Sequence, residues 1–164
     1  DGECAGCCFT HHGGWGDQVM LSPHFALAEF AVSDTASRRG IDNTPPGHVI
    51  PALTRTALGL EAVRVRLGTA PITITSGYRS LPLNRLIGSR DSSQHVLGEA
   101  ADFICPRFGT PKEIVAALRD SGIPFDQLIL EFAGKGAGWV HVSFTDNPRR
   151  MALEIDSQGT RLLA

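Results

Sequence analysis

Apolar residues recur at helical spacing in the first half of the chain and predict a long helix. The periodic segment begins near Val49 and ends at Leu67. Pro51 fits only in the first turn of such a helix, and Gly68 directly follows its last apolar residue. The apolar positions are Ile50, Leu53, Leu58, Leu60, Val63 and Val65. We therefore expect one amphipathic helix across this segment.

A shorter helical pattern precedes it. Ser22 is a favourable N-cap, and Pro23 suits the first position of a helix. The apolar residues expected on one face of this helix are Phe25, Leu27 and Phe30. The next stretch, residues 34–47, is rich in polar and helix-breaking residues, so we expect a loop there.

The second half of the chain changes to the patterns of strands. Predicted strands cover residues 71–76, 100–106, 125–132 and 139–144. The glycine-rich stretch 133–138 predicts a hairpin between the last two. Residues 151–156 and 160–164 indicate a final hairpin or a tail strand.

One further helix is expected between these strands. Thr110 is a good N-cap, Pro111 follows it, and Glu113 lies in the first turn, while Gly122 closes the segment. Together these elements predict an α+β fold with a mostly antiparallel sheet flanked by helices.

Composition restricts the class of protein. The chain has 164 residues, of which 42% are hydrophobic, which suits one compact domain with a real core. Fifteen basic and seventeen acidic residues give no strong field, so we expect neither nucleic acid nor a membrane surface as partner. No apolar run is long enough for a membrane span, and no leader of basic and then apolar residues is visible.

The cysteines crowd one end of the chain. Cys4, Cys7 and Cys8 lie within the first ten residues, which is not a distributed disulfide framework. A zinc knuckle is one interpretation, but the spacing of a second ligand pair is missing. Met20 resembles a natural start, so we interpret residues 1–19 as an N-terminal extension and residues 20–164 as the domain.

Three residues of the second half can converge on one point. His95 precedes a tight turn through Gly98, and Asp102 lies in the strand that leaves this turn. A carboxylate in an apolar strand costs free energy unless it is paired or bound to a metal. His141 lies within the strand 139–144, on the face opposite its valine neighbours. Two imidazoles and a carboxylate with an open fourth position are typical of a catalytic zinc site.

The segments "ITSGYRS", "SSQHVLGEAADF" and "WVHVSF", in this order, resemble peptidase family M15, the zinc D-Ala-D-Ala carboxypeptidases and peptidoglycan endopeptidases. The family signature S-x-H-x-x-G-x-A-x-D is complete here, and W-x-H follows it. The resemblance covers roughly residues 21–150, and "LSPHFALAEF" and "RRGIDNTPP" also resemble the small phage and prophage members of the family. It implies a single domain of the zinc D-Ala-D-Ala carboxypeptidase, or hedgehog-like, type.

The resemblance also implies roles for individual residues. His95, Asp102 and His141 would bind zinc. Arg79 would bind substrate and stabilise the developing oxyanion, although a salt bridge that braces its loop is an alternative. Ser93 would brace the His95 loop or touch substrate. Further residues expected to line the substrate cleft are Tyr78 and Trp139, and a core role for the tryptophan stays open.

The general base departs from the family pattern. Many members carry an acidic residue three positions before the last histidine, where this chain has Gly138. Glu131, at the end of the preceding strand, is the nearest acidic candidate, because a hairpin can fold it back beside His141. Asp126 is the second choice. An exposed structural position for Glu131 remains the alternative.

The implied function is zinc-dependent hydrolysis of peptide bonds in bacterial peptidoglycan, in stem peptides or cross-bridges. Carboxypeptidase and endopeptidase action both stay open, and a phage or prophage lysis enzyme is the expected setting. Such an enzyme accumulates in the cytoplasm before lysis, unless a leader has been removed. Two alternatives are a zinc-binding module without turnover and a phage structural component with the same fold.

Overall fold

The computed structural model describes residues 19–134 and 138–163. Its helices are α1 (Leu27–Ala31), α2 (Asp34–Arg39), the 3₁₀ turn η1 (Gly47–Val49), α3 (Ile50–Arg66), α4 (Leu81–Leu86) and α5 (Pro111–Arg119). Its strands are β1 (Met20–Ser22), β2 (Phe25–Ala26), β3 (Thr73–Ser76), β4 (Ala100–Ile104), β5 (Gln127–Glu131), β6 (Trp139–Ser143), β7 (Met151–Asp156) and β8 (Gly159–Leu162).

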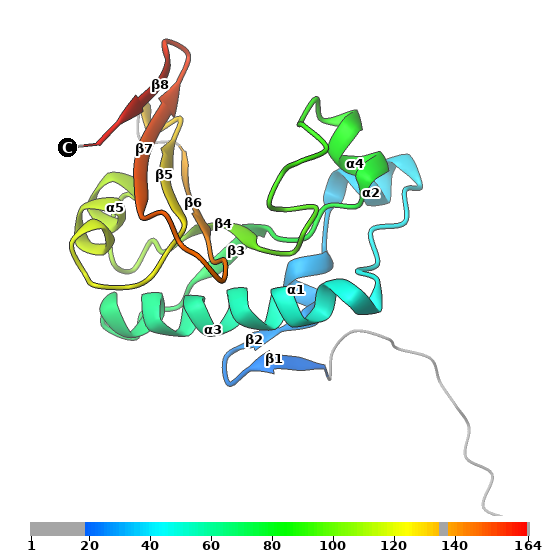
Figure 1. Ribbon diagram of the computed structural model, residues 1–164, viewed down its shortest axis with the longest axis horizontal. Helices are drawn as coiled ribbons and strands as arrows, with labels where there is room; N and C mark the ends of the chain where they lie inside the picture. Colours follow the sequence, from blue (N-terminus) through cyan, green and yellow to red (C-terminus); the bar gives the residue numbers. More distant parts are fainter. Residues whose placement is uncertain (1–18, 135–137, 164) are drawn as a thin grey trace, which may run out of the picture.

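Six strands form the main sheet, in the order β3-β4-β6-β5-β7-β8. Every neighbouring pair is antiparallel except β5 and β7, which run parallel. The predicted α+β class with a mostly antiparallel sheet is therefore confirmed. In Figure 1 the sheet stands between α5 on the left and the segment with α4 on the right, and α3 runs beneath it.

The two helices with the clearest sequence patterns are confirmed. α3 covers almost the whole predicted segment, with Pro51 in its first turn. α5 begins after Thr110, whose hydroxyl accepts a hydrogen bond from the backbone N–H of Glu113, while the Glu113 carboxylate accepts one from the backbone N–H of Thr110. This reciprocal capping box satisfies two donors that the first turn would otherwise leave free.

The prediction that Ser22 caps a helix is wrong. Ser22 ends β1, and a tight turn through Pro23 leads into β2. The Ser22 hydroxyl instead donates to Glu61 of α3 at 2.7 Å, and the backbone N–H of His24 donates to the same carboxylate oxygen at 2.8 Å. A tertiary contact with α3 thus replaces the local cap.

The predicted loop over residues 34–47 contains α2, so this prediction is wrong for its first half. Ser33 caps α2 by accepting a hydrogen bond from Ala36, and Gly40 ends it in the left-handed conformation with φ +62°. These capping residues were visible in the sequence, but the helix is only six residues long and buries one side chain, Ala36. α4 was also not predicted.

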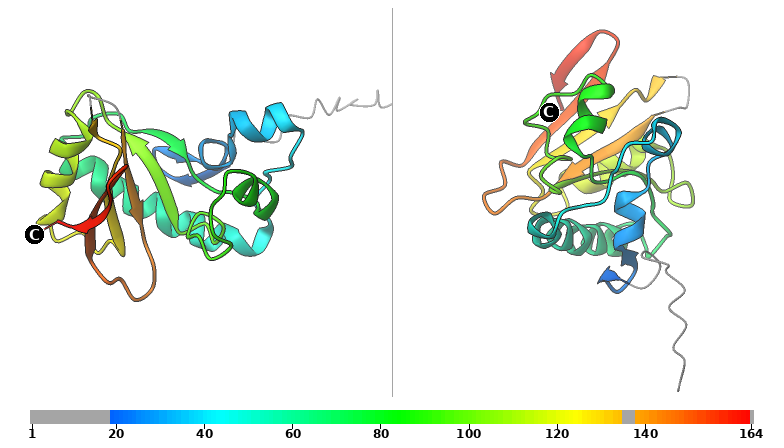
Figure 2. Two further views of the ribbon diagram at one scale, coloured as in Figure 1. Left: turned by 90° about the horizontal axis from the view of Figure 1, so that it is seen from above. Right: turned by 90° about the vertical axis from the view of Figure 1, so that its right-hand side faces the viewer.

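The two faces of the main sheet have different partners. α3 and α5 cover the face from which Phe103, Leu128 and Val140 project into the core. Fully buried large side chains of this core include Phe25, Phe30, Leu53, Leu60, Ile114, Leu118 and Phe125. Because side chains alternate along a strand, Asp102 and His141 project from the other face. The two views of Figure 2 show α4 and its flanking loops away from the helices that cover the core face.

Several sequence interpretations fall on the chain ends and the hairpin tip. Cys4, Cys7 and Cys8, and nearly all of the interpreted extension 1–19, lie outside the described residues, as do residues 135–137 of the glycine-rich connection. The antiparallel pairing of β5 with β6, and of β7 with β8, confirms both expected hairpins. Across the described parts of the chain, no helix is both long and apolar enough to cross a membrane.

Candidate metal centre

The sheet register places Asp102 and His141 side by side. Asp102 of β4 pairs directly with His141 of β6, and His141 pairs on its other side with Ile129 of β5. Directly paired residues share one face of a sheet. The carboxylate and the imidazole therefore project together from the face opposite the core.

A tight turn brings the third residue to the same place. The backbone N–H of Gly98 donates to the carbonyl of His95 at 3.3 Å, and Gly98 has φ +74°. A Cβ atom there would lie 2.5 Å from Cγ1 of Val49, so the turn requires glycine for its backbone angle and for space. The expected tight turn is present, and it returns the chain into β4.

A hydrogen bond fixes the orientation of the His95 ring. Nδ1 of His95 lies 2.7 Å from the backbone carbonyl of Gly77. A carbonyl oxygen can only accept, so Nδ1 carries the hydrogen, and a neutral ring then has its lone pair on Nε2. Burial lowers the pKa of His95 despite the nearby Asp102 carboxylate, which favours this neutral form. Neutral imidazole is the form that binds metal ions.

The three groups form a small triangle of potential ligand atoms. His141 Nδ1 lies 2.9 Å from Asp102 Oδ1, and His95 Nε2 lies 3.2 Å from each of these atoms. Ligands bound tetrahedrally at about 2.0–2.1 Å from zinc are separated by about 3.3 Å. The exposed fraction is 3% for His95, 5% for Asp102 and 7% for His141. The geometry and chemistry of this group therefore fit one zinc ion.

Arg79 holds the second oxygen of Asp102. One guanidinium nitrogen lies 2.6 Å from Asp102 Oδ2, and Nε donates to the hydroxyl of Ser76 at 2.9 Å. Burial alone would raise the pKa of Asp102, but His95 and His141 lower it well below its usual range. The carboxylate is therefore ionised, with Oδ1 directed toward the histidines. Arg79 thus forms a salt bridge with Asp102 of β4 and also lines the cleft.

The triangle opens into a cleft. This cavity of about 410 Å³ is lined by Arg79, Ile87, Gly88, Ser89, Ser93, His95, Asp102, Glu131, Trp139 and His141. A neighbouring cavity of about 340 Å³ shares Arg79 and Ile87 with it. Tyr78 lines this second cavity, so the structure places it beside the cleft and not at the metal group. The two cavities together provide room for an extended ligand on either side of Arg79.

The other residues expected at the cleft have distinct contacts. The Ser93 hydroxyl accepts a hydrogen bond of 3.4 Å from the backbone N–H of His95, which is the bracing contact considered from the sequence. The Trp139 ring packs against Phe132 at 5.6 Å between centroids. Its indole nitrogen is buried and has no hydrogen-bond partner among the described residues. Both residues thus line the cleft.

Glu131 lies at the cleft, as expected from the hairpin. It pairs with Trp139 across β5 and β6, so it shares the face of the sheet that carries His141. Its side chain is partly buried, and burial, together with the negative charge of Asp102, raises the pKa of Glu131. A carboxylate with a raised pKa, in the cleft that holds the candidate metal ligands, suits proton transfer.

The backbone explains why position 138 is glycine. Gly138 has φ +102°, and a Cβ atom there would lie 2.3 Å from the carbonyl oxygen of Glu131. Any side chain would therefore be strained by its backbone angle and would collide with the facing strand. The hairpin that brings Glu131 to the cleft excludes an acidic residue at 138.

Asp126, the second choice for a base, does not line the cleft. It is 2% exposed and binds Arg149 and Gln94. Hydrogen bonds from Arg149 lower the pKa of Asp126 to about 2 despite its burial. A carboxylate that is so weakly basic and fully engaged is unsuited to accept a proton from water. No role was predicted for Gln94 from the sequence. The only indication of a role there is its position next to His95.

Fold and site together agree with the motif resemblance. A family model described as peptidase M15 matches residues 23–143, most of the chain, so this chain belongs to the peptidase M15 family. Over 43 residues the chain is 42% identical to the zinc D-Ala-D-Ala carboxypeptidase of Streptomyces albus G. That stretch covers 26% of this chain and 17% of the relative. β7 and β8 lie beyond the residues that the family model matches.

Proposed function

We propose that this chain is a zinc peptidase that hydrolyses peptide bonds in peptidoglycan stem peptides or cross-bridges. The observation that carries the proposal is the triangle of His95, Asp102 and His141, with ligand atoms 2.9–3.2 Å apart at the floor of a cleft. Family membership supports peptidase chemistry, and the name of the Streptomyces relative supports a wall peptide as substrate. Residues 20–164 would form the peptidase domain, with residues 1–19 as an extension.

His95 Nε2, Asp102 Oδ1 and His141 Nδ1 would hold the ion. Bound zinc supplies a Lewis acid that polarises a carbonyl and lowers the pKa of water to about 7. Glu131 would take a proton from the attacking water and deliver it to the leaving amine. Both transfers need a carboxylate at the cleft whose pKa is raised toward neutrality, as burial does here.

Arg79, Ser93, Trp139 and Tyr78 would bind the substrate. Nη1 of Arg79 has no acceptor among the described residues, so it can donate to the substrate carbonyl while Nη2 keeps Asp102 in place. The indole N–H of Trp139 is buried and has no partner among the described residues, so Trp139 would contact the substrate through its ring. Tyr78 would contact the part of the peptide that extends past Arg79. Donors aimed at a developing oxyanion are a large source of rate enhancement.

The direct test combines metal analysis with digestion of purified peptidoglycan and mass spectrometry of the fragments. We expect one zinc per chain and newly released peptides whose ends identify the cut bond. Zinc without any cleavage would favour a binding module without turnover, and absence of stoichiometric zinc would refute the proposal. A phage or prophage lysis enzyme is the proposed setting. Co-purification with virions would instead indicate a structural component.

A further inference from the structure

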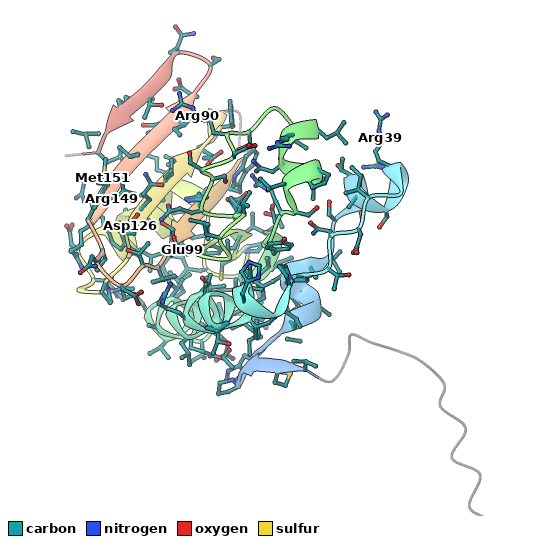
Figure 3. The ribbon with its side chains drawn as sticks, turned by 45° about the vertical axis from the view of Figure 1, so that its right-hand side comes forward. Arg39, Arg90, Glu99, Asp126, Arg149 and Met151 are labelled. Carbon is teal, nitrogen blue, oxygen red and sulfur yellow. The ribbon has the colours of Figure 1, made fainter. Side chains whose placement is uncertain are left out.

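A buried carboxylate outside the cleft has no part in the proposed reaction. Asp126 precedes β5 and is 2% exposed. Its Oδ1 accepts hydrogen bonds of 2.9 Å from both the backbone N–H and Nε of Arg149, which precedes β7. A second guanidinium nitrogen binds Oδ2. Figure 3 shows Arg149 and Asp126 next to each other, with Glu99 below them. Such a two-pronged arginine contact fixes the orientation of a carboxylate.

Asp126 in turn binds the residue next to a proposed zinc ligand. Nε2 of Gln94 donates to Asp126 Oδ2 at 3.0 Å. The backbone carbonyl of Gln94 accepts a hydrogen bond of 2.9 Å from Glu99, across the turn that carries His95. Gln94 therefore ties this turn to the start of β5 through its side chain and closes the turn through its backbone.

The amide of Gln94 lies between acceptors. Its side chain also lies near the Glu99 carboxylate, which pairs with Arg55. A carboxylate can only accept, so the bond to Asp126 requires the NH₂ end of the amide, and this determines its orientation. The amide oxygen is left buried without a partner among the described residues. A buried acceptor without a partner costs free energy, so the bond to Asp126 holds Gln94 in this orientation at a cost.

We propose that Arg149, Asp126 and Gln94 form a hydrogen-bonded relay that fixes the turn carrying His95 and thereby sets the zinc affinity of the site. This rests on the proposed function, because it takes His95 as a zinc ligand. All three are positioning residues, since they act through His95 and touch neither zinc nor substrate. The relay complements the bond between His95 Nδ1 and Gly77, which orients the ring but does not fix its turn.

The relay predicts that a change at the far end weakens zinc binding. Arg149→Met removes both side-chain bonds to Asp126 and leaves the turn untouched. Gln94→Leu removes the bond next to His95. In competition with a chelator, we expect Gln94→Leu to raise the Kd for Zn²⁺ about 10-fold, as for other residues that orient metal ligands. We expect a smaller increase of the same sign for Arg149→Met.

Arg150→Met is the matched control. Arg150 is adjacent in sequence and carries the same charge, but it donates to the carbonyl of Ile123 at 2.7 Å and packs over Phe125 at 5.0 Å. We expect Arg150→Met to lower thermal stability without changing the Kd. Because the Arg149 side chain is 54% exposed, Arg149→Met keeps the test decisive even if Gln94→Leu does not fold.

Hydrogen exchange of the metal-free protein provides a readout that needs no zinc. The amides of Gly98 and Glu99 donate within the turn, so we expect faster exchange there in Gln94→Leu and Arg149→Met than in Arg150→Met. Unchanged exchange, or equal effects of Arg149→Met and Arg150→Met on the Kd, would overturn the relay. A wild-type protein that takes up no zinc would refute the proposed function, and exchange would then decide on the relay alone.

Discussion

Replacing Glu131 with glutamine tests the part of the expected motif at which this chain departs from the family pattern, the general base. The substitution keeps the shape of the side chain but removes its proton acceptor. Glu131 lies at the cleft but outside the triangle of His95, Asp102 and His141, so zinc content is expected to stay the same. Loss of a general base typically slows a reaction about 10²–10⁴-fold. This corresponds to about 3–5 kcal/mol in the activation free energy.

The structure also gives the expected effect on stability. Burial raises the pKa of Glu131, so its ionised form is disfavoured in the folded protein. At pH values above this raised pKa, ionisation opposes folding, and a neutral glutamine removes the opposition. Glu131→Gln should therefore unfold at the same temperature as wild type or at a higher one. A loss of activity cannot then be ascribed to unfolding.

The assay is the release of peptides from purified peptidoglycan under saturating zinc, with zinc content and thermal unfolding measured on the same samples. Glu154→Gln is the control, because Glu154 pairs with Leu130 in the neighbouring strand and so faces away from Glu131. We expect this control to hydrolyse at the wild-type rate. Hydrolysis by Glu131→Gln within a few-fold of wild type would refute the assignment of the base.

Three other predictions concern stability. Gly138→Glu, which restores the family's acidic position, should destabilise the fold by about 1–3 kcal/mol and lower the unfolding temperature, because the backbone angle and the Glu131 carbonyl exclude a side chain; an unchanged temperature would contradict this. Thr110→Ala should cost about 1 kcal/mol in urea unfolding through loss of the α5 cap, whereas Thr110→Ser should cost little. Asp126 stabilises the fold at pH values above its ordinary pKa, and this contribution of about 2 kcal/mol is lost as pH falls toward about 2. The stability difference between metal-free wild type and Asp126→Asn should therefore shrink on acidification below about pH 4, and a constant difference would contradict the shift.

Local patterns predicted the parts of the fold that local interactions determine. The long helix α3 follows from apolar periodicity and from Pro51, and α5 from the capping pair Thr110 and Glu113. The prediction for Ser22 was wrong because the sequence Ser-Pro is the same in two situations. The serine can cap a helix, or its hydroxyl can bind a distant carboxylate. Its partner, Glu61, is 39 positions away. α2 was missed because one short helix with a single buried side chain has no periodicity to detect.

The candidate site likewise has a part that local sequence predicts and a part that depends on contacts between distant segments. The signature motif contains His95, Gly98 and Asp102, so the turn and its two polar residues could be predicted together. The direct pairing of Asp102 with His141 depends on strand order, which alternation alone does not determine. The contact between Arg79 and Asp102, and the relay from Arg149 to Gln94, join segments of the chain that have no sequence pattern in common.

The two carboxylates at opposite ends of β5 show how the surroundings assign their roles. Asp126, just before the strand, receives a guanidinium and an amide, and these donors lower its pKa to about 2. Glu131, at the other end, accepts no side-chain hydrogen bond from the described residues, and burial together with the charge of Asp102 raises its pKa. Groups whose pKa values are driven apart in this way divide structural and proton-transfer roles between them. Because both carboxylates depend on where β5 begins and ends against β6, the same strand register excludes a side chain at Gly138 and places Glu131 at the cleft.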